Sequence, residues 1–383
     1  MPSANRIPTS HTGGLFRPAN LPASGLSRLL GREEQGASSD PRVTAMRLRE
    51  AVSQVVRQQL ESGLDIIGDG ELGKGDHLTY VTHRLSGLGL VERRHEWKRF
   101  LDWERFPDYY DKHPLFAQSP LNIGNRSLAF VDVVRYSGQD ELRQDLANLR
   151  SAMDGLGAVD GFYPCTAPGI VLDYYPNNYY PSDRDCLFAI AEALSVEYRA
   201  VVDAGFLLQI DAPDLAQNYC LQSFCDLKSY RLATELRIEA LNHALKDIPR
   251  DRIRVHVCWG SWWGPHQTDV PLAEIINLLL KLRMSCLSIE AATVNHAADW
   301  HVWEQVRVPD DLVIMPGMIT HKTDTVEDAQ LVADHLGRYT RIFGNDRVIA
   351  GTDCGMVRCA TPSLAWAKFA ALVAGAALAS RAR

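Results

Sequence analysis

Residues 253–258 read IRVHVC, residues 271–283 read PLAEIINLLLKLR, and residues 284–290 read MSCLSIE. The first and third stretches are short apolar runs of the kind that form buried strands. The second stretch carries its apolar residues at helical spacing. Together they predict a strand–helix–strand unit, which is typical of a parallel sheet covered by helices.

The same alternation extends over most of the chain. Further strands are predicted around Ser10–Leu15 and at Leu64–Gly68, Val159–Cys165, Phe206–Asp211, Leu312–Gly317 and Arg347–Asp353. Further helices are predicted at Arg42–Ser62, Asp183–Ala204, Leu227–Lys246, Thr325–Phe343 and Pro362–Ala379. Eight strands, each followed by a helix, can close into a barrel. We therefore predict an α/β fold, a (β/α)8 TIM barrel formed as a single domain by residues 1–383.

One stretch, Leu88–Asn148, interrupts the alternation between the second and third predicted strands. It is crowded with aromatic residues and with charges of both signs. We interpret it as an insertion, and Ser127–Arg135 predicts an extra strand within it. The insertion is either a surface subdomain or a cap over the end of the barrel where active sites lie.

Charge and hydropathy exclude several classes of protein. The net charge of −7, without a long basic run, argues against nucleic-acid binding. The N-terminus has no apolar stretch of the secretory type, and the longest apolar run, Phe369–Leu378, is too short to span a bilayer. We expect a cytoplasmic protein without membrane contact, in which the eight cysteines form no disulfides.

Ionisable residues gather where the predicted strands end, which is where barrel enzymes place their active sites. They are His11, Glu71, Asp211, His256, Cys258, Glu290, His321 and Cys354. Among them, His256 and Cys258 are two positions apart in one strand, so their side chains point to the same face. With Glu290 and Cys354 they form a set of N, S, O and S donors that suits tetrahedral Zn²⁺. The alternative for a strand-borne His and Cys is that they are buried core residues.

Four segments resemble the C-terminal catalytic barrel of cobalamin-independent methionine synthase. They are GDGELGKGDHLTYV (68–81), LLQIDAPDLA (207–216), VHVCWG (255–260) and AGTDCG (350–355). The resemblance implies that His256, Cys258, Glu290 and Cys354 bind zinc. It also implies that Glu71 holds the amino group of homocysteine, that Asp211 lies at the reacting centre and that His321 transfers a proton. Tyr174 falls where the family has a tryptophan that packs on folate. We add His11, on the first predicted strand, to the substrate-binding residues.

The chain departs from that family in length and at two positions. It has room for one barrel instead of two, Gly14 replaces a serine, and Ala212 replaces a glutamate. Single-barrel relatives include the epoxyalkane:coenzyme M transferases, which this chain also resembles. The implied function is zinc-dependent transfer of a methyl or epoxide-derived alkyl group to a thiol. The thiol would be homocysteine or similar to coenzyme M, and the donor similar to methyltetrahydrofolate or an epoxide.

Two other functions remain open at this point. One is a zinc methyltransferase that works with a separate corrinoid protein, and the other is a barrel that binds zinc or a thiol without catalysis. A thiol that carries a sulfonate would need a cation in the pocket, and the candidates are Arg17, Lys74 and Arg84.

Overall fold

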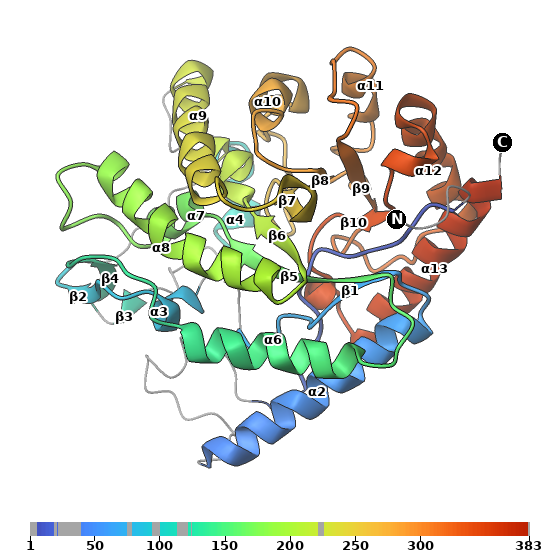
Figure 1. The fold of residues 1–383 in the computed structure, drawn as a ribbon. Coiled ribbons are helices and arrows are strands. Elements are labelled where there is room, and N and C mark those ends of the chain that lie inside the picture. The colour runs from blue at the N-terminus through green and yellow to red at the C-terminus, as the bar shows by residue number, and fades with distance from the viewer. Residues whose placement is uncertain are drawn as a thin grey trace.

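The computed structural model describes residues 6–18, 21, 40–74, 79–93, 100–112, 122–123, 125–220 and 226–381. Its centre is a parallel sheet of seven strands in the order β1-β5-β6-β7-β8-β9-β10 (Figure 1). The strands are β1 (Ile66–Gly68), β5 (Asp160–Thr166), β6 (Leu207–Asp211), β7 (Ile253–Val257), β8 (Cys286–Ile289), β9 (Val313–Ile319) and β10 (Gly351–Thr352). Each strand lies within or close to a stretch predicted as a strand.

The segment at Thr9 and Ser10 closes the sheet into a ring. Thr9 forms a parallel bridge with Ala350, next to β10, and Ser10 forms one with Ile66 in β1. This segment therefore occupies the eighth strand position, and the predicted α/β barrel is confirmed. The paired part is only two residues long, because the chain bends away after His11 toward the cavity described below.

Helices surround the sheet on its outer side (Figure 1). The long ones are α2 (Pro41–Glu61), α6 (Gln139–Met153), α8 (Asp183–Asp203), α9 (Leu227–Ala244), α10 (Leu272–Leu279), α12 (Ala329–Phe343) and α13 (Pro362–Arg381). Shorter helices are α3 (Val81–Arg84), α7 (Pro168–Tyr174) and α11 (Trp300–Trp303). Polar side chains cap the N-termini of several of these helices. Backbone N–H groups in the first turns of α2, α8, α9 and α12 donate to Asp40, Ser182, Asp226 and Asp328, respectively.

Helix α13 is long and apolar enough, by length and composition alone, to cross a membrane; among the described helices it alone meets that test. It packs along α12, and Phe369 and Leu372 are fully buried in the main core. Its Lys368 is also buried and donates to both carboxylate oxygens of Glu327 at 3.0 Å. Helix α13 thus has the contacts of a core helix.

The segment between β1 and α6, here called the excursion, ends earlier than the predicted insertion. Residues 139–148, predicted as its end, belong to helix α6, which packs against α2 on the barrel. The excursion holds a three-stranded antiparallel sheet, in which β4 (Arg126–Phe130) lies between β2 (Leu88–Val91) and β3 (Asn122–Ile123). Strand β4 confirms the extra strand, although it begins one residue earlier and ends five residues earlier than predicted.

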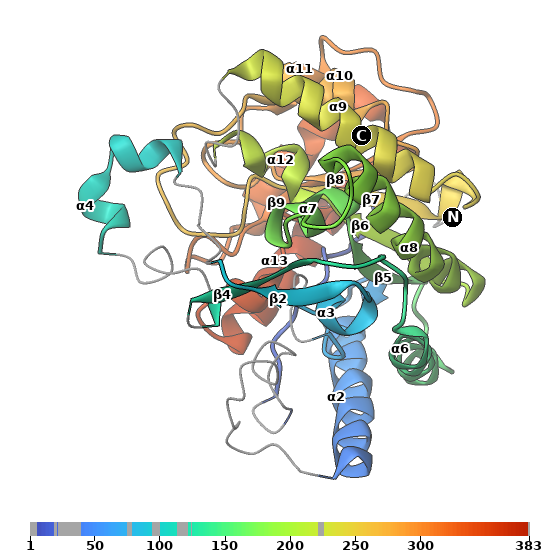
Figure 2. The same ribbon diagram turned by 90° about the vertical axis from the view of Figure 1, so that its left-hand side faces the viewer.

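An aromatic cluster ties the excursion to the loop that follows β7. It combines Phe100, Tyr110 and partly buried neighbours, including Trp262. The rings of Phe100 and Trp262 are 4.4 Å apart, and the backbone N–H of Gln267 donates to the carboxylate of Asp102 at 2.9 Å. Helix α4 (Pro107–Tyr110) stands at the edge of the molecule in Figure 2. This part of the excursion therefore braces the loop that begins at Cys258.

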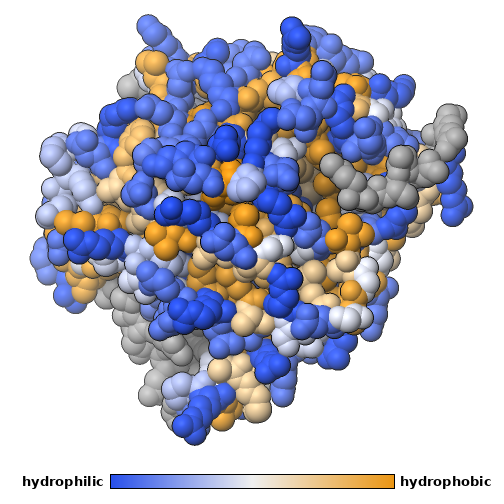
Figure 3. Space-filling view, viewed as in Figure 1, coloured by the Kyte–Doolittle hydropathy of each residue, from blue (hydrophilic) through white to orange (hydrophobic). Residues whose placement is uncertain are grey.

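The outer surface is mostly hydrophilic on the face seen in Figure 3, with hydrophobic residues scattered among the charged ones. The barrel interior, in contrast, holds a few buried polar side chains. Arg254 donates to Ser10 Oγ at 2.9 Å and to the carbonyl of His11 at 3.0 Å. These bonds fix the closing segment from inside the ring.

Candidate active site

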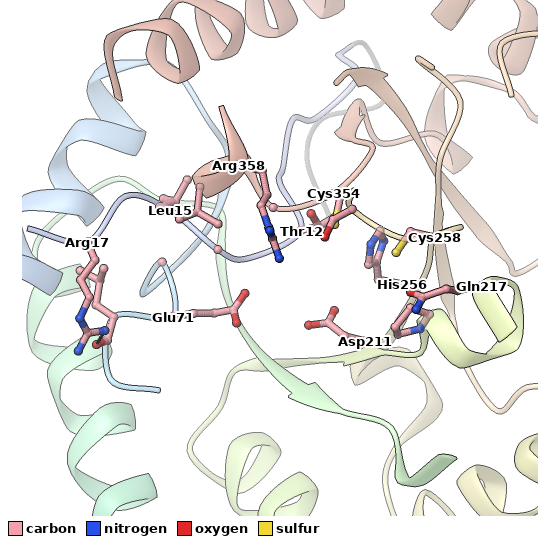
Figure 4. A pocket seen from close by; sticks show the side chains of 17 residues that line it. Thr12, Leu15, Arg17, Glu71, Asp211, Gln217, His256, Cys258, Cys354 and Arg358 are labelled. Atoms are coloured by element: carbon pink, nitrogen blue, oxygen red, sulfur yellow. Dashed lines mark hydrogen bonds between the residues drawn. The ribbon is translucent and has the colours of Figure 1, made fainter. Parts of the chain in front are cut away.

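A cavity of about 410 Å³ opens at the carboxyl ends of the strands (Figure 4). Its lining combines residues from strand ends far apart in the sequence: Thr12, Gly14, Arg17, Glu71, Asp211, Gln217, His256, Cys258, Cys354 and Arg358 are among them. Five of the residues predicted for the site therefore lie around one space. Parallel strands carry their C-terminal ends to the same side of the barrel, and this explains the convergence.

His256, Cys258 and Cys354 form a compact group on one wall of the cavity. Their candidate ligand atoms all lie within 4.8 Å of one another. The Nδ1 atom of His256 is 3.1 Å from Ser288 Oγ on the neighbouring strand β8. Its Nε2 atom is buried and has no hydrogen-bond partner among the described residues. A buried nitrogen without a partner beside two sulfur atoms is the arrangement that a metal ion would complete.

The two cysteines of this group shift each other's pKa in opposite directions. The thiol of Cys258 donates a hydrogen bond to Cys354, and this bond, together with nearby His256, holds the pKa of Cys354 well below its usual value. The same contact, with burial, raises the pKa of Cys258. Thiolate is the form in which cysteine binds metal, and two sulfurs with one imidazole nitrogen suit Zn²⁺. The residues present therefore fit the predicted metal.

Glu290, the fourth predicted ligand, is held by a different partner. Lys322 Nζ lies 3.0 and 3.3 Å from the two carboxylate oxygens of Glu290. The backbone N–H of Trp259 also donates to Glu290, at 3.2 Å. Glu290 is thus held by Lys322 and Trp259, and it is absent from the compact group. The sequence analysis assigned no role to Lys322, although it directly follows the predicted His321.

Glu71 lies in a loop of unusual backbone geometry after β1. Its φ is +60°, and its own N–H donates to Asp69 Oδ1 at 2.9 Å. The carboxylate lies against Gly13, where a Cβ would be 2.3 Å from Glu71 Oε1. Gly13 also has a φ of +123°, which an L side chain rarely adopts. The two glycines after Thr12 therefore make room for the Glu71 carboxylate.

Asp211 faces Glu71 across the cavity (Figure 4). It is register-paired with His256 on the neighbouring strand, and Gln209 Nε2 donates to its Oδ1 at 2.7 Å. Burial away from water has the largest effect on Glu71, and the negative charge of Asp211 has the second largest. Together they raise the pKa of Glu71 to about 8. The carboxyl group of Glu71 therefore keeps its proton at neutral pH.

Besides Glu290, three predicted residues do not line this cavity. His11 is buried inside the barrel, where Nε2 is 2.7 Å from Gln59 Oε1 and Nδ1 accepts from the N–H of Gly13. Burial lowers its pKa to about 3. Tyr174 is the last residue of α7 and is not among the lining residues. His321 is buried behind Ser261, and its Nε2 donates to the Ser261 carbonyl at 3.2 Å. His11 thus supports the backbone of the site from within the barrel.

Two residues of the site carried no prediction of their own. Arg358 follows Cys354 by four residues and lines the cavity. Asp353 points away from the cavity and accepts hydrogen bonds from the N–H groups of Ala291, Ala292 and Thr293, at 2.8, 2.8 and 2.9 Å. Asp353 adjoins Cys354 and Arg358 lies four residues after it, and this proximity in the chain was their signal in the sequence. Asp353 ties the loop after β8 to the end of β10.

The closed parallel barrel, with a His/Cys group at its strand ends, defines an α/β barrel with a candidate metal centre. No family model matches the chain. The sequence is 23% identical over 310 residues to methionine synthase of Sulfolobus acidocaldarius, covering 80% of this chain and 75% of that protein. It is 24% identical over 349 residues to 2-hydroxypropyl-CoM lyase of Xanthobacter autotrophicus, covering 81% and 79%.

Solved structures agree with these relatives on the fold. A B12-independent methionine synthase from Shewanella sp. W3-18-1, in complex with selenomethionine, superposes with a TM-score of 0.73 at 20% identity, over 97% of both chains. A putative B12-independent methionine synthase from Listeria monocytogenes gives 0.66 at 18% identity, over 97% of this chain and 98% of that one. Together the comparisons confirm the resemblance to the cobalamin-independent methionine synthase superfamily in its single-barrel form.

Proposed function

We propose that the protein is a methyl- or alkyltransferase that acts on thiols, with zinc held by His256, Cys258 and Cys354. The observation that carries this proposal is the compact group of one imidazole and two cysteine sulfurs on the wall of a cavity. Relatives named methionine synthase and 2-hydroxypropyl-CoM lyase support the same class of reaction. Zinc bound there would lower the pKa of a substrate thiol and favour its thiolate at neutral pH.

The remaining residues of the cavity suit the other half of the reaction. The thiolate sulfur forms a bond to an alkyl carbon, while the bond from that carbon to its nitrogen or oxygen breaks and leaves its electron pair there. The leaving atom then needs a proton. Glu71 keeps its proton at neutral pH and faces Asp211 over the cavity. We assign the proton delivery to this pair, with Asp211 next to the metal group and Glu71 orienting the thiol substrate.

His321 is a weaker candidate for the proton donor. Burial lowers its pKa, so the ring is neutral near pH 7, and its N–H at Nε2 is engaged by the carbonyl of Ser261. Its Nδ1 atom has no hydrogen-bond partner in the described part of the chain. A neutral ring in that state accepts a proton more readily than it donates one.

X-ray absorption at the zinc edge tests the proposal directly. We expect one zinc per chain with one nitrogen and two sulfur donors, and one additional sulfur when a substrate thiol is added. Cys258→Ser and Cys354→Ser should lose zinc and alkyl transfer together, whereas Cys186→Ser, at a buried cysteine on α8, should keep both. Full alkyl transfer by metal-free protein would refute the role of zinc. Bound zinc that no thiol approaches would refute the whole reaction.

A further inference from the structure

A chain of four charged side chains links the loops that follow β7 and β8. Asp269 Oδ2 lies 2.9 Å from Nδ1 of His266, in the same loop, and 3.2 Å from Nε2 of His296, in the loop after β8. The Nδ1 atom of His296 is in turn 2.8 Å from Asp299 Oδ2. The side chains of Asp269 and of both histidines are only 4–7% exposed. We call these four residues the carboxylate–histidine chain.

The hydrogen bonds of this chain are complete only when the rings are protonated at both nitrogens. Every ring nitrogen faces an oxygen that accepts, since His266 Nε2 lies 3.1 Å from the carbonyl of Trp262. Burial alone would lower the pKa of His296. The hydrogen bonds to Asp269 and Asp299 outweigh burial and raise this pKa to about 9. His296 thus carries a positive charge between two carboxylates at neutral pH.

The loop after β7 adopts a rare backbone conformation at this chain. His266 has a φ of +51°, which costs free energy for a residue with a Cβ. Its carbonyl accepts from Asn295 Nδ2 at 2.7 Å, and its ring stacks on Trp262 with ring centres 4.5 Å apart. Such a conformation persists only where the surrounding contacts hold it. The loop after β8 therefore fixes the path of the loop after β7.

The carboxylate–histidine chain reaches the metal group through Trp259. The rings of His296 and Trp259 are stacked, with centres 3.9 Å apart and planes inclined by 25°. A charged imidazole over an indole face adds a cation–π attraction to this contact. Trp259 is fully buried, directly follows Cys258, and donates its backbone N–H to Glu290 at 3.2 Å. The position of His296 thus restrains the residue next to one of the candidate metal ligands.

We propose that Asp269 is a positioning residue, which holds Cys258 in its metal-binding place through His296 and Trp259. This inference rests on the proposed function and adds a determinant of metal affinity to it. Asp269 belongs neither to the compact group nor to the residues that line the cavity. Its effect is therefore indirect. Residues that orient metal ligands in this way typically change metal affinity about tenfold to hundredfold when they are replaced.

Titration of the metal-free, reduced protein with Co²⁺ tests this proposal. Cobalt bound by thiolates shows a sulfur-to-metal charge-transfer absorption, so the spectrum reports the cysteines as well as the affinity. Asp269→Asn keeps the size of the side chain but replaces one acceptor oxygen by an amide donor. We expect cobalt affinity to fall about tenfold to hundredfold and the charge-transfer band per bound cobalt to weaken. Asp269→Glu retains the carboxylate and should recover part of both losses.

Two further variants separate positioning from a general loss of stability. Asp173→Asn removes another mostly buried carboxylate, which pairs with Arg237 at 2.7 and 2.8 Å. It should lower the resistance to urea while cobalt affinity and spectrum stay as in wild type. Asp299→Asn acts at the more exposed end of the carboxylate–histidine chain, where the carboxylate is 23% exposed. It should weaken cobalt binding by a smaller factor, and it decides the question if circular dichroism shows that Asp269→Asn does not fold.

The outcomes keep this inference apart from the proposed function. Wild-type cobalt affinity and spectrum in Asp269→Asn, or in Asp299→Asn where the first variant does not fold, would overturn the positioning role. Equal weakening in Asp173→Asn would overturn it as well, since the effect would then be general. In both cases a charge-transfer band in wild type leaves the proposed function standing. If wild type binds cobalt without that band, the proposed function fails and the role of Asp269 falls with it.

Discussion

Lys322 and Glu290 form a buried ion pair in which Nζ lies 3.0 Å from one carboxylate oxygen and 3.3 Å from the other. The backbone N–H of Trp259, next to Cys258, also donates to Glu290, and Glu290 does not belong to the compact group of His256, Cys258 and Cys354. A metal held by His256, Cys258 and Cys354 would then have three protein ligands instead of four. A fourth position would stay open for a substrate sulfur.

Lys322→Met should release Glu290 to the metal. Zinc-edge X-ray absorption without thiol should then detect an oxygen donor that is absent from wild type. The metal-free variant should also lose about 3 kcal/mol of unfolding free energy, because a buried carboxylate remains without its partner. Lys281→Met, which removes an exposed lysine paired with Glu235, serves as the control. An identical metal shell in variant and wild type would show that the ion pair does not govern Glu290.

Gly13→Ala should displace the Glu71 carboxylate. The new Cβ would be 2.3 Å from Glu71 Oε1, and the φ of +123° adds strain of about 1–2 kcal/mol. Thiol affinity, measured by calorimetry, should therefore fall while zinc affinity stays the same. Gly155→Ala is the matched control, since it has a φ of +74° with no atom within 4 Å of the added Cβ. It should reproduce the loss of stability without the loss of thiol affinity.

Glu71→Gln should change how stability depends on pH. The pKa of Glu71 is about 8 in the folded protein, against an ordinary value near 4.5. The folded state thus binds this proton more tightly than the unfolded state, and its stabilising contribution is lost as pH rises from about 4.5 through about 8. In metal-free protein, wild type should lose a few kcal/mol relative to Glu71→Gln across that window. Denaturant unfolding at pH 5, 7 and 9 measures it, and parallel curves would contradict the shift.

Asp353→Ala should loosen the ends of β8 and β10 together. Three backbone N–H groups, of Ala291, Ala292 and Thr293, would lose their common acceptor. We expect a loss of about 3 kcal/mol or more in unfolding free energy, together with weaker zinc binding because Cys354 adjoins Asp353. Asp310→Ala, at an exposed aspartate, should change neither property. Normal stability in Asp353→Ala would mean that water replaces the carboxylate.

The sequence predicted those site residues whose position follows from the strands alone. His256 and Cys258 share a face because strand side chains alternate, and barrel closure brings Cys354 to them. The sequence did not predict the orientation of the Glu290 side chain. Lys322, which pairs with Glu290, lies in a loop whose path depends on tertiary contacts. Arg358 was missed for a similar reason, since the bond from Val357 to Gly14 sets its direction. His11 was predicted to bind substrate, but its side chain lies inside the barrel. Two paired residues show too little alternation for the sequence to indicate which side chains face the barrel interior.

The bridge between Thr9 and Ala350 joins residues 341 positions apart in the chain. Contacts of such long range form slowly, since a large loop must close before they contribute. During synthesis, the ring must stay open until the ribosome has released the segment beyond residue 350. Cys354 belongs to that last segment, whereas His256 and Cys258 emerge about a hundred residues earlier. Closure of the ring and assembly of the complete His/Cys group therefore both require the short segment from Ala350 to Cys354 to have left the ribosome.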